Sequence, residues 1–280
     1  MHRMKFLKDK VAEIEKDDHD MEGEEMRSSR ISAVVLMVLL SIVFTGNIFA
    51  AENKVSGTAS VDVLSNYVWR GQKLTNSWVI QPSVGITYGS FCANIWANYD
   101  SDSKIDEGDG HGEFSETDLT LNYSFSVEKW NFSAGYIYYA FTGANDTQEV
   151  YLSTSYSTLL NPTLTIYYDY DEGNGAFVIA AISHSFEVFK GSSLKLSASA
   201  SYNINDKIMG FDEDANDFSN FYNGELSAGL SIPITKAISI TPKVAYSFPL
   251  SDNAEEAIKG VSDDGDKDIL YGGINVTLSF

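Results

Sequence analysis

The stretch Tyr271-Gly-Gly-Ile-Asn-Val-Thr-Leu-Ser-Phe280 decides the fold of this 280-residue chain. Successive side chains of a β-strand point to opposite faces. One face of the stretch is apolar and carries Ile274, Val276, Leu278 and Phe280. The other face is polar. A strand that ends on an aromatic residue without a tail is unusual in a soluble domain, where the last residues commonly fray. A soluble sandwich could also end in such a strand, so the remaining sequence must decide the fold.

The same alternation recurs after Lys54 in short segments separated by turn-forming residues. Twelve segments show it: 55–63, 78–88, 90–100, 116–125, 130–141, 148–158, 163–171, 176–188, 194–203, 223–232, 236–248 and 269–280. No helical stretch is evident between them. We therefore expect an all-β antiparallel fold and exclude a parallel sheet built from βαβ units.

The connections between these segments alternate in length. Those after the even-numbered segments are tight: residue 89, then 126–128, 159–161, 189–191 and 233–235. Those after the odd-numbered segments are generally longer and more polar: 71–77, 101–113, 142–147, 172–175, 205–220 and 249–266. This alternation is typical of a transmembrane antiparallel up-and-down β-barrel, here of about twelve strands, with its tight turns in the periplasm.

The two faces of the segments favour the membrane barrel over the sandwich. One face is dominated by Leu, Val, Ile, Ala and Tyr, and the other by Ser, Thr, Asn and Gly. A barrel in lipid has an apolar outside and accepts a polar inside, whereas a sandwich buries its inner faces between two sheets. The chain also has 16 Tyr and 16 Phe. Many lie near segment ends, as in the aromatic girdles of membrane barrels.

Residues 26–50 predict a cleavable signal peptide. Arg27 and Arg30 precede an apolar run from 31 to 44, and the expected cleavage follows Ala50. The run is near the lower end of the ~17–25 residues that a spanning helix needs, so a single membrane anchor is the weaker alternative. Residues 1–25 are rich in charge and precede Met26. We interpret them as a leader or a gene-model extension, so the barrel would occupy residues 51–280.

The expected mature chain is strongly acidic. The whole chain has 19 basic and 39 acidic residues, and residues 1–50 contain 7 and 9 of them, which leaves 12 and 30, a formal net charge of −18. Such a chain should not bind nucleic acid through bulk charge. The single cysteine, Cys92, cannot form an internal disulfide. Neither His111 nor His184 is near Cys92 in sequence, so we interpret Cys92 as a strand residue and not as a catalytic thiol.

Two stretches resemble those of bacterial outer-membrane barrels. The final segment is similar to the terminal strand that such barrels present to the barrel-assembly machinery, with glycine and apolar positions at Gly273, Val276, Leu278 and Phe280. Ser65-Asn-Tyr-Val-Trp-Arg-Gly71 resembles the TorF-like porin family, more loosely through 95–98, 116–118, 135–139 and 148–151. The resemblance implies a channel-like barrel in the outer membrane of a Gram-negative bacterium. Its expected partners are lipid, lipopolysaccharide and small solutes.

Charged residues are expected on the inside of the barrel, which we call the lumen. Arg70 follows the first segment at the expected extracellular rim. It is either a charge at a pore constriction or a structural arginine paired with a carboxylate such as Asp62 or Asp100, with Gly71 completing the turn. The other predicted lumen charges are Asp62, Glu116, Asp118, Asp169, Lys195, Glu225 and Lys243. If the lumen is open, their acidic excess favours cations; if it is plugged, they pair with one another.

The long connections are acidic, with clusters at 100–109, 212–217 and 263–268. An EF-hand needs Gly at position six of its loop and Glu at position twelve. These positions fall on Ile105 and His111 in the first cluster, and on Asp217 and Asn223 in the second. We therefore expect solvated acidic loops, no cofactor and no specific metal site, and leave open loose divalent-cation binding beside lipopolysaccharide phosphates.

Some twelve-stranded outer-membrane barrels are phospholipases with a catalytic histidine and serine, so an enzyme is a further alternative. Ser183-His184-Ser185 is the candidate, and Phe186 stands where that arrangement needs a serine. Adjacent strand residues point to opposite faces, so His184 cannot engage either serine within one strand. We predict no enzyme. The sequence favours a passive diffusion channel for small cationic or neutral solutes, with a non-conducting barrel that interacts through its acidic loops as the alternative.

Overall fold

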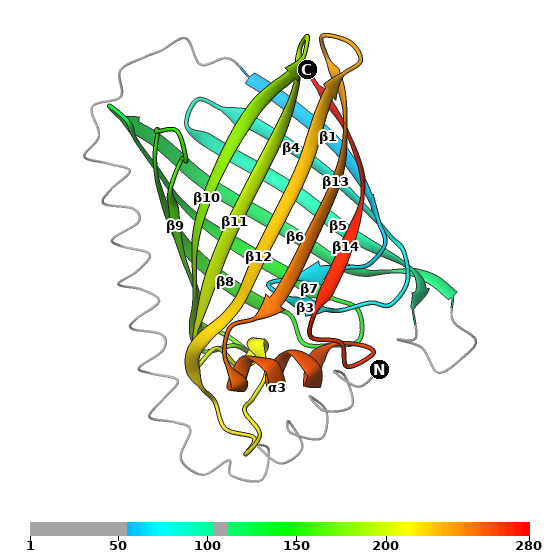
Figure 1. Ribbon diagram of the computed structural model, residues 1–280, viewed down its shortest axis with the longest axis vertical. Coiled ribbons are helices and arrows are strands. Elements are labelled where there is room, and N and C mark those ends of the chain that lie inside the picture. Colours follow the sequence, from blue (N-terminus) through cyan, green and yellow to red (C-terminus); the bar gives the residue numbers. More distant parts are fainter. Residues whose placement is uncertain (1–54, 104–110) are drawn as a thin grey trace.

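The computed structural model describes residues 55–103 and 111–280 (Figure 1). The predicted leader, signal peptide and cleavage site lie outside the described residues, as does most of the first acidic cluster. In the described part of the chain, no helix is long and apolar enough to cross a membrane.

The chain forms a closed antiparallel barrel of 12 strands, which confirms the predicted fold class. The barrel strands are β1 (Val55–Leu64), β4 (Val79–Tyr88), β5 (Phe91–Ser103), β6 (His111–Val127), β7 (Trp130–Phe141), β8 (Thr147–Tyr156), β9 (Thr163–Asp169), β10 (Gly175–Phe189), β11 (Ser192–Ile204), β12 (Ser219–Pro233), β13 (Ile238–Pro249) and β14 (Ile269–Ser279). Each strand pairs with its neighbours in the chain, and β1 closes the ring on β14.

The closure depends on the carboxyl-terminal segment. Val61 pairs with Val276 in the β1–β14 ladder. Beyond the ladder, the backbone N–H of Phe280 donates to the Gly57 carbonyl over 2.9 Å, and the N–H of Gly57 donates back over 2.7 Å. The Phe280 ring lies on the Gly57 backbone, where any side chain would collide with it. A glycine in the first strand therefore accommodates the terminal aromatic residue.

The alternation of the strands separates an apolar outside from a polar inside. The pairing registers give each strand one lumen face and one outer face, as period-two alternation requires. The exposed apolar side chains gather on the outer faces, among them Val84, Ile95, Leu152, Leu226 and Ile274. This is the arrangement of a barrel that faces lipid, because lipid-facing strands need apolar side chains.

The two ends of the barrel differ. One end, which we call the turn end, carries the connections 89–90, 128–129, 157–162, 190–191 and 234–237, and the carboxyl terminus lies there (Figure 1). The other, the loop end, carries 65–78, 142–146, 170–174, 205–218 and 250–268. Apart from 157–162, which is longer than 142–146 and 170–174, the predicted alternation of tight and long connections is present in the structure.

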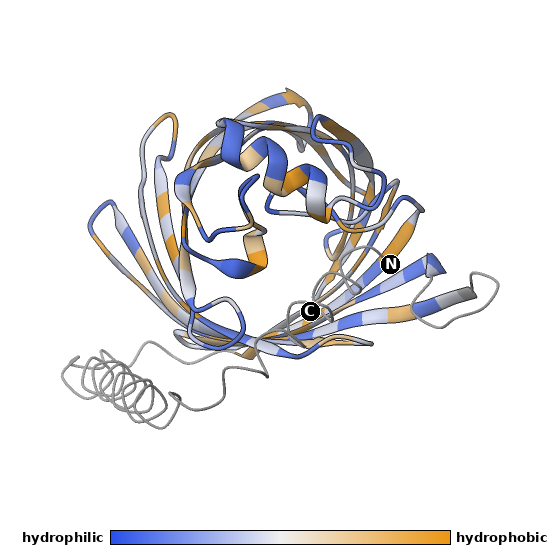
Figure 2. Ribbon diagram, turned by 90° about the horizontal axis from the view of Figure 1, so that it is seen from below, coloured by the Kyte–Doolittle hydropathy of each residue, from blue (hydrophilic) through white to orange (hydrophobic). Residues whose placement is uncertain are grey.

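Three loop-end connections contain secondary structure of their own. The first holds a hairpin of β2 (Val68–Trp69) and β3 (Gln72–Lys73), and 205–218 holds the 3₁₀ helix η1 (Lys207–Met209). The last holds the helix α3 (Asp252–Val261). Seen from the loop end, α3 lies within the outline of the barrel (Figure 2).

Helix α3 corrects the sequence analysis, which found no helical stretch. The Ser251 hydroxyl caps the helix by accepting the backbone N–H of Ala254 over 3.3 Å. Glu255 and Lys259 form an i,i+4 ion pair at 2.7 Å on its exposed side. Its buried residues, among them Ala257 and Ile258, point to the barrel. A helix of 10 residues in a polar loop leaves few apolar positions, so the strand pattern on both sides obscures it.

The loop-end connections pack against the barrel wall to form a small apolar core. Its buried members are Phe177, Met209, Phe218, Tyr222, Ala254, Ala257, Ile258 and Ile269. They come from β10, η1, β12, α3 and β14 together with residue 218. The loops at this end therefore fold inward and are held by burial of apolar surface, worth ~25 cal/mol per Å².

Candidate functional site in the barrel lumen

The β2–β3 hairpin carries Arg70 into the lumen. Its two central residues, Arg70 and Gly71, have φ values of 49° and 84°. Two consecutive left-handed residues are the signature of a type I′ hairpin turn. Gly71 is required twice over, because its φ is positive and a side chain there would collide with Asn223. The turn thus directs the Arg70 side chain inward.

Arg70 makes a two-pronged ion pair across the barrel. Its Nη1 and Nη2 atoms donate to Oε1 and Oε2 of Glu149 on β8, each over 2.7 Å. Nη1 also lies 4.0 Å from Oδ2 of Asp206 in the β11–β12 connection. The side chains of Arg70, Glu149 and Asp206 are 6%, 2% and 0% exposed. The guanidinium also lies 4.3–4.9 Å from three aromatic rings, those of Trp69, Tyr167 and Phe177.

The sequence analysis offered a carboxylate such as Asp62 or Asp100 as one possible partner of Arg70, and the carboxylates found at Arg70 are Glu149 and Asp206. Asp62 instead binds Lys243 at 2.6 Å, and Asp100 accepts a hydrogen bond from Ser77. The reason is geometric: the hairpin tip turns away from its own strands and crosses toward β8. Strand alternation predicts which face a strand residue occupies, but it does not predict where the tip of a loop lies.

Gln72 and Lys73, the two residues that follow the Arg70–Gly71 turn, bind the other connections that fold inward. Gln72 Nε2 donates to the Ile208 carbonyl over 3.0 Å and to the Tyr222 hydroxyl over 3.1 Å. Lys73 forms ion pairs with Asp264 and Asp266, the latter at 3.4 Å. Arg70, Gln72 and Lys73 therefore bind, in turn, the barrel wall, the β11–β12 connection and the β13–β14 connection. We call the hairpin and the two connections it binds, 205–218 and 250–268, the plug.

Carboxylates surround Arg70 in excess. Glu149 also accepts from the Tyr139 hydroxyl over 2.8 Å. Asp169 accepts from the Thr147 hydroxyl over 2.7 Å and is 1% exposed. Glu116 and Asp118 follow on the inner face of β6. Burial raises the pKa of Asp206 to about 7, Arg70 opposes this shift, and Asp169 and Glu149 add to it.

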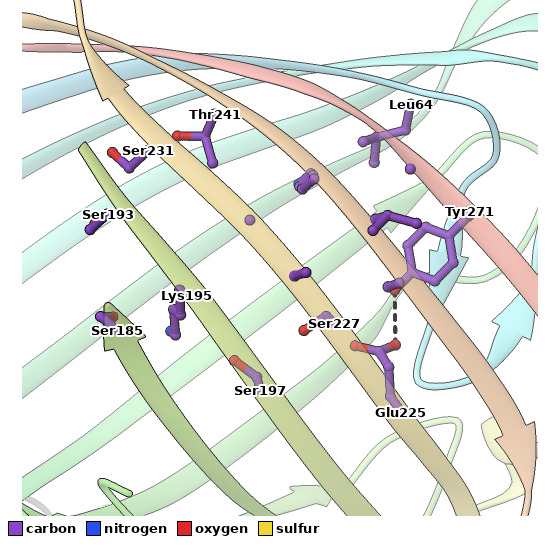
Figure 3. A pocket seen from close by; sticks show the side chains of 16 residues that line it. Leu64, Ser185, Ser193, Lys195, Ser197, Glu225, Ser227, Ser231, Thr241 and Tyr271 are labelled. Carbon is purple, nitrogen blue, oxygen red and sulfur yellow. Dashed lines mark hydrogen bonds between the residues drawn. The ribbon is translucent and has the colours of Figure 1, made fainter. Parts of the chain in front are cut away.

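The lumen toward the turn end has a different lining. A cavity of about 430 Å³ lies there between β10, β11, β12, β13 and β14 (Figure 3). Lys195, Lys243 and Glu225 are its charged residues, and most of the other lining side chains are small or carry a hydroxyl group. Glu225 accepts from the Tyr271 hydroxyl over 2.8 Å, as the dashed line in Figure 3 shows.

The structure places the eight predicted lumen residues inside the barrel in two groups. Arg70, Glu116, Asp118 and Asp169 lie toward the loop end, while Asp62, Lys195, Glu225 and Lys243 lie toward the turn end or midway. Sequence reasoning missed Glu149 and Asp206, the two carboxylates at Arg70. Glu149 could have been found, because it has the lumen-facing parity of β8. Asp206 lies in a connection and had no such signal.

The remaining predicted residues lie on the barrel wall. Val276 and Leu278 are on its outer face and are 42% and 41% exposed, whereas Gly273 faces the lumen against the β1 backbone. Cys92 is a partly buried free thiol on the lumen face of β5. His184 is on the outer face of β10, with Nδ1 2.7 Å from the Leu159 carbonyl oxygen. Among the described residues, no His, Cys, Asp and Glu cluster is arranged to hold a metal ion.

Comparisons with known proteins find similarity at the level of fold. No protein-family model matches the chain, and no curated protein matches its sequence. The solved structures that resemble it include the NanC porin, with 12% identity, coverage of 80% of this chain and 99% of that one, and a TM-score of 0.46. An outer membrane channel from Pseudomonas putida F1 has 10% identity, coverage of 84% and 98%, and a TM-score of 0.48. Outer membrane phospholipase A of Escherichia coli has 13% identity, coverage of 83% of this chain and 93% of that one, and a TM-score of 0.41.

Proposed function

We propose that this chain is an outer-membrane channel for passive diffusion of small cationic or neutral solutes, with the plug as its constriction. The observation that carries the proposal is the Arg70–Glu149 ion pair, which fixes an inward hairpin in an otherwise polar lumen. A barrel that served as a rigid wall alone would not need polar side chains inside. Polar lumens combined with inward loops are how membrane barrels restrict passage.

The proposed preference for cations rests on the charges at the constriction. Glu149 and Asp206 face the guanidinium of Arg70. Asp118 and Asp169 lie near these two carboxylates, and Glu116 lies beside Asp118. A ring of acidic side chains in a narrow passage attracts cations and repels anions. Export through a signal peptide at 26–50 and insertion by the barrel-assembly machinery through the β14 segment belong to the same proposal. So do the lipid contacts of the outer face and the absence of a catalytic role for His184.

Planar-bilayer conductance of residues 51–280 in asymmetric potassium chloride tests the proposal. We expect discrete current steps and a reversal potential that indicates cation preference. Glu116→Gln, on the lumen wall, should shift that potential toward zero, whereas Glu213→Gln, at an exposed loop position, should leave it unchanged. A folded barrel that never conducts would contradict the channel, and an anion-selective potential would contradict the charge preference.

A non-conducting barrel is the second candidate, and the apolar core of the plug favours it. Phe177, Tyr222 and Ile258 are 0% exposed, so this part of the loop end is filled. Under this alternative the acidic connections would act at the cell surface. Replacing the hairpin residues 67–74 by a short Gly-Ser linker separates the two candidates. A channel restricted by the plug should conduct more after the replacement, whereas steps that appear after it and are absent in the wild type would favour the second candidate.

A further inference from the structure

The cavity toward the turn end has the size of a small-molecule binding site. Its volume of about 430 Å³ is within the ~300–1,000 Å³ of small-molecule sites. Hydroxyl groups from four strands line it: Ser185, Ser193, Ser197, Ser227, Ser231 and Thr241. No hydrogen bond from the side chains of Ser193, Ser197 or Ser227 is found within the described part of the chain. These hydroxyls are therefore available to a solute.

A glycine opens the space between the two lysines of the cavity. Lys195 on β11 pairs with Gly229 on β12, and Gly229 pairs with Lys243 on β13, so the three residues form one row across the wall. Adjacent strands are ~4.8 Å apart, so the two lysine Cα atoms are separated by about 10 Å. A Cβ atom at Gly229 would meet nothing nearer than 3.5 Å. The glycine leaves room above the row, although crowding does not require a glycine at this position.

The two lysines differ in their partners. Lys243 Nζ is 2.6 Å from Asp62 Oδ1, so its charge is matched within the barrel. Lys195 is exposed to the lumen and has no ion pair or hydrogen bond among residues 55–103 and 111–280. An unmatched ammonium beside free hydroxyl donors is suited to an oxyanion, because charge-assisted hydrogen bonds are about twice as strong as neutral ones.

The opposite side of the cavity provides an acceptor. Glu225 uses Oε2 to accept from Tyr271, and no partner within the described chain is found for Oε1. A carboxylate oxygen accepts hydrogen bonds and cannot donate them. It therefore repels the charged group of an anion but binds a hydroxyl. The cavity offers a cation at one side, hydroxyl groups between, and an acceptor at the other.

We propose that this cavity binds a small polyhydroxylated anion. Its carboxylate or phosphate group lies at Lys195, and its hydroxyl groups extend along the serines toward Glu225. This site goes beyond the proposed channel function and does not depend on it, because binding needs access to the cavity and no passage through the plug. If the barrel conducts, this site would hold such a solute in the lumen even when the concentration of the solute outside is low.

Equilibrium binding to the refolded barrel in detergent tests this proposal without any measurement of current. The probes are gluconate and glucose 6-phosphate, with glucose as the neutral polyol and acetate as the anion without hydroxyl groups. We expect titration calorimetry to show that gluconate, glucose 6-phosphate or both bind at least tenfold more tightly than glucose and acetate. A preference between the two identifies the carboxylate or the phosphate as the favoured oxyanion.

Variants at two lysines locate the site. Lys195→Met should weaken binding of the preferred probe at least tenfold, Lys195→Arg should retain most of it, and Lys190→Met, at an exposed turn position outside the cavity, should leave it unchanged. Heat-dependent mobility in SDS confirms that each variant is folded. Equal binding of all four probes to the wild type, or unchanged binding in folded Lys195→Met, would overturn the proposal.

Discussion

The two halves of the lumen are built from the same strands but have opposite interiors. Toward the loop end, inward side chains such as Phe177, Asn203 and Tyr222 are completely buried by the plug. Toward the turn end, the inward side chains of the same strands line an open cavity, and Lys195 is exposed to it. Strand alternation thus determines which residues point inward, but the inward-folding connections determine what those residues meet.

Among the changes considered, loss of the Arg70–Glu149 ion pair should have the largest effect on the stability of the loop half. Arg70→Met removes the guanidinium and leaves Glu149, 2% exposed, without its cation. Removal of one partner from a buried pair costs about 3–5 kcal/mol, because the remaining charge is buried and unmatched. We expect the free energy of unfolding in vesicles to fall by about this amount and the loop-end connections to become accessible to protease.

The control for this variant is an exposed ion pair at the same end. Lys259→Met removes the pair with Glu255, in which the side chains are 37% and 30% exposed. An exposed pair of this kind contributes little to stability. If Arg70→Met and Lys259→Met lowered the stability equally, the plug would not depend on the Arg70–Glu149 pair, and the contrast between the two halves would have another cause.

The sequence predicted which strand residues of the barrel wall face the lumen in both halves. It did not predict the plug or the cavity inside. Period-two alternation was sufficient to place Glu116, Lys195 and Glu225 inside, because each lies on a strand whose neighbours fix its parity. Arg70 was identified as a lumen candidate, but the carboxylates found at it are not those offered as possible partners. Its partner Glu149 is 79 residues away along the chain, and that contact depends on the direction of a two-residue turn. Long-range loop contacts of this kind have no local periodicity.

Helix α3 was missed for a different reason. The signals of a helix are present locally, with Ser251 as the cap and the Glu255–Lys259 pair one turn apart. They cover 10 residues within a polar connection, and the strand alternation on both sides dominates the sequence pattern. Connections longer than about 12–15 residues are often functional, so they should be searched for helices even in an all-β chain.

The buried Asp206 gives the loop half a pH dependence. Its pKa is about 7 in the folded chain against 3.8 for an ordinary aspartate, so the folded state binds a proton more tightly than the unfolded state does. Stability from this group is therefore gained as the pH falls through 7 and is absent above it. Between pH 8 and pH 5 we expect a gain of up to about 2.5 kcal/mol in the free energy of unfolding.

Asp206→Asn isolates this group from the other carboxylates that titrate in the same range. The amide keeps an oxygen that can accept the Ile208 N–H, which donates to Asp206 over 3.0 Å. The variant should be more stable than the wild type at pH 8 and should have a flatter pH profile, measured by guanidinium unfolding at pH 5, 6, 7 and 8. Parallel profiles for the two proteins would show that Asp206 is already ionised in the folded state.

The smallest expected effect compares two serines of the same strand. Ser201 and Ser197 both point inward from β11, one in each half of the lumen. Ser201 is 4% exposed, and its hydroxyl oxygen accepts the Asn223 N–H over 2.9 Å. Ser201→Ala leaves that buried donor without a partner, which costs about 1–2 kcal/mol.

Ser197→Ala removes a hydroxyl that faces the cavity, so its effect should be within about 0.5 kcal/mol. Unfolding of the two variants under identical conditions measures the difference directly, because the strand, the residue type and the substitution are the same. Equal costs would mean that the two halves are packed alike. A larger cost for Ser201→Ala would show that the inward hydroxyl of the loop half is held by hydrogen bonds that, within the described chain, Ser197 lacks in the turn half.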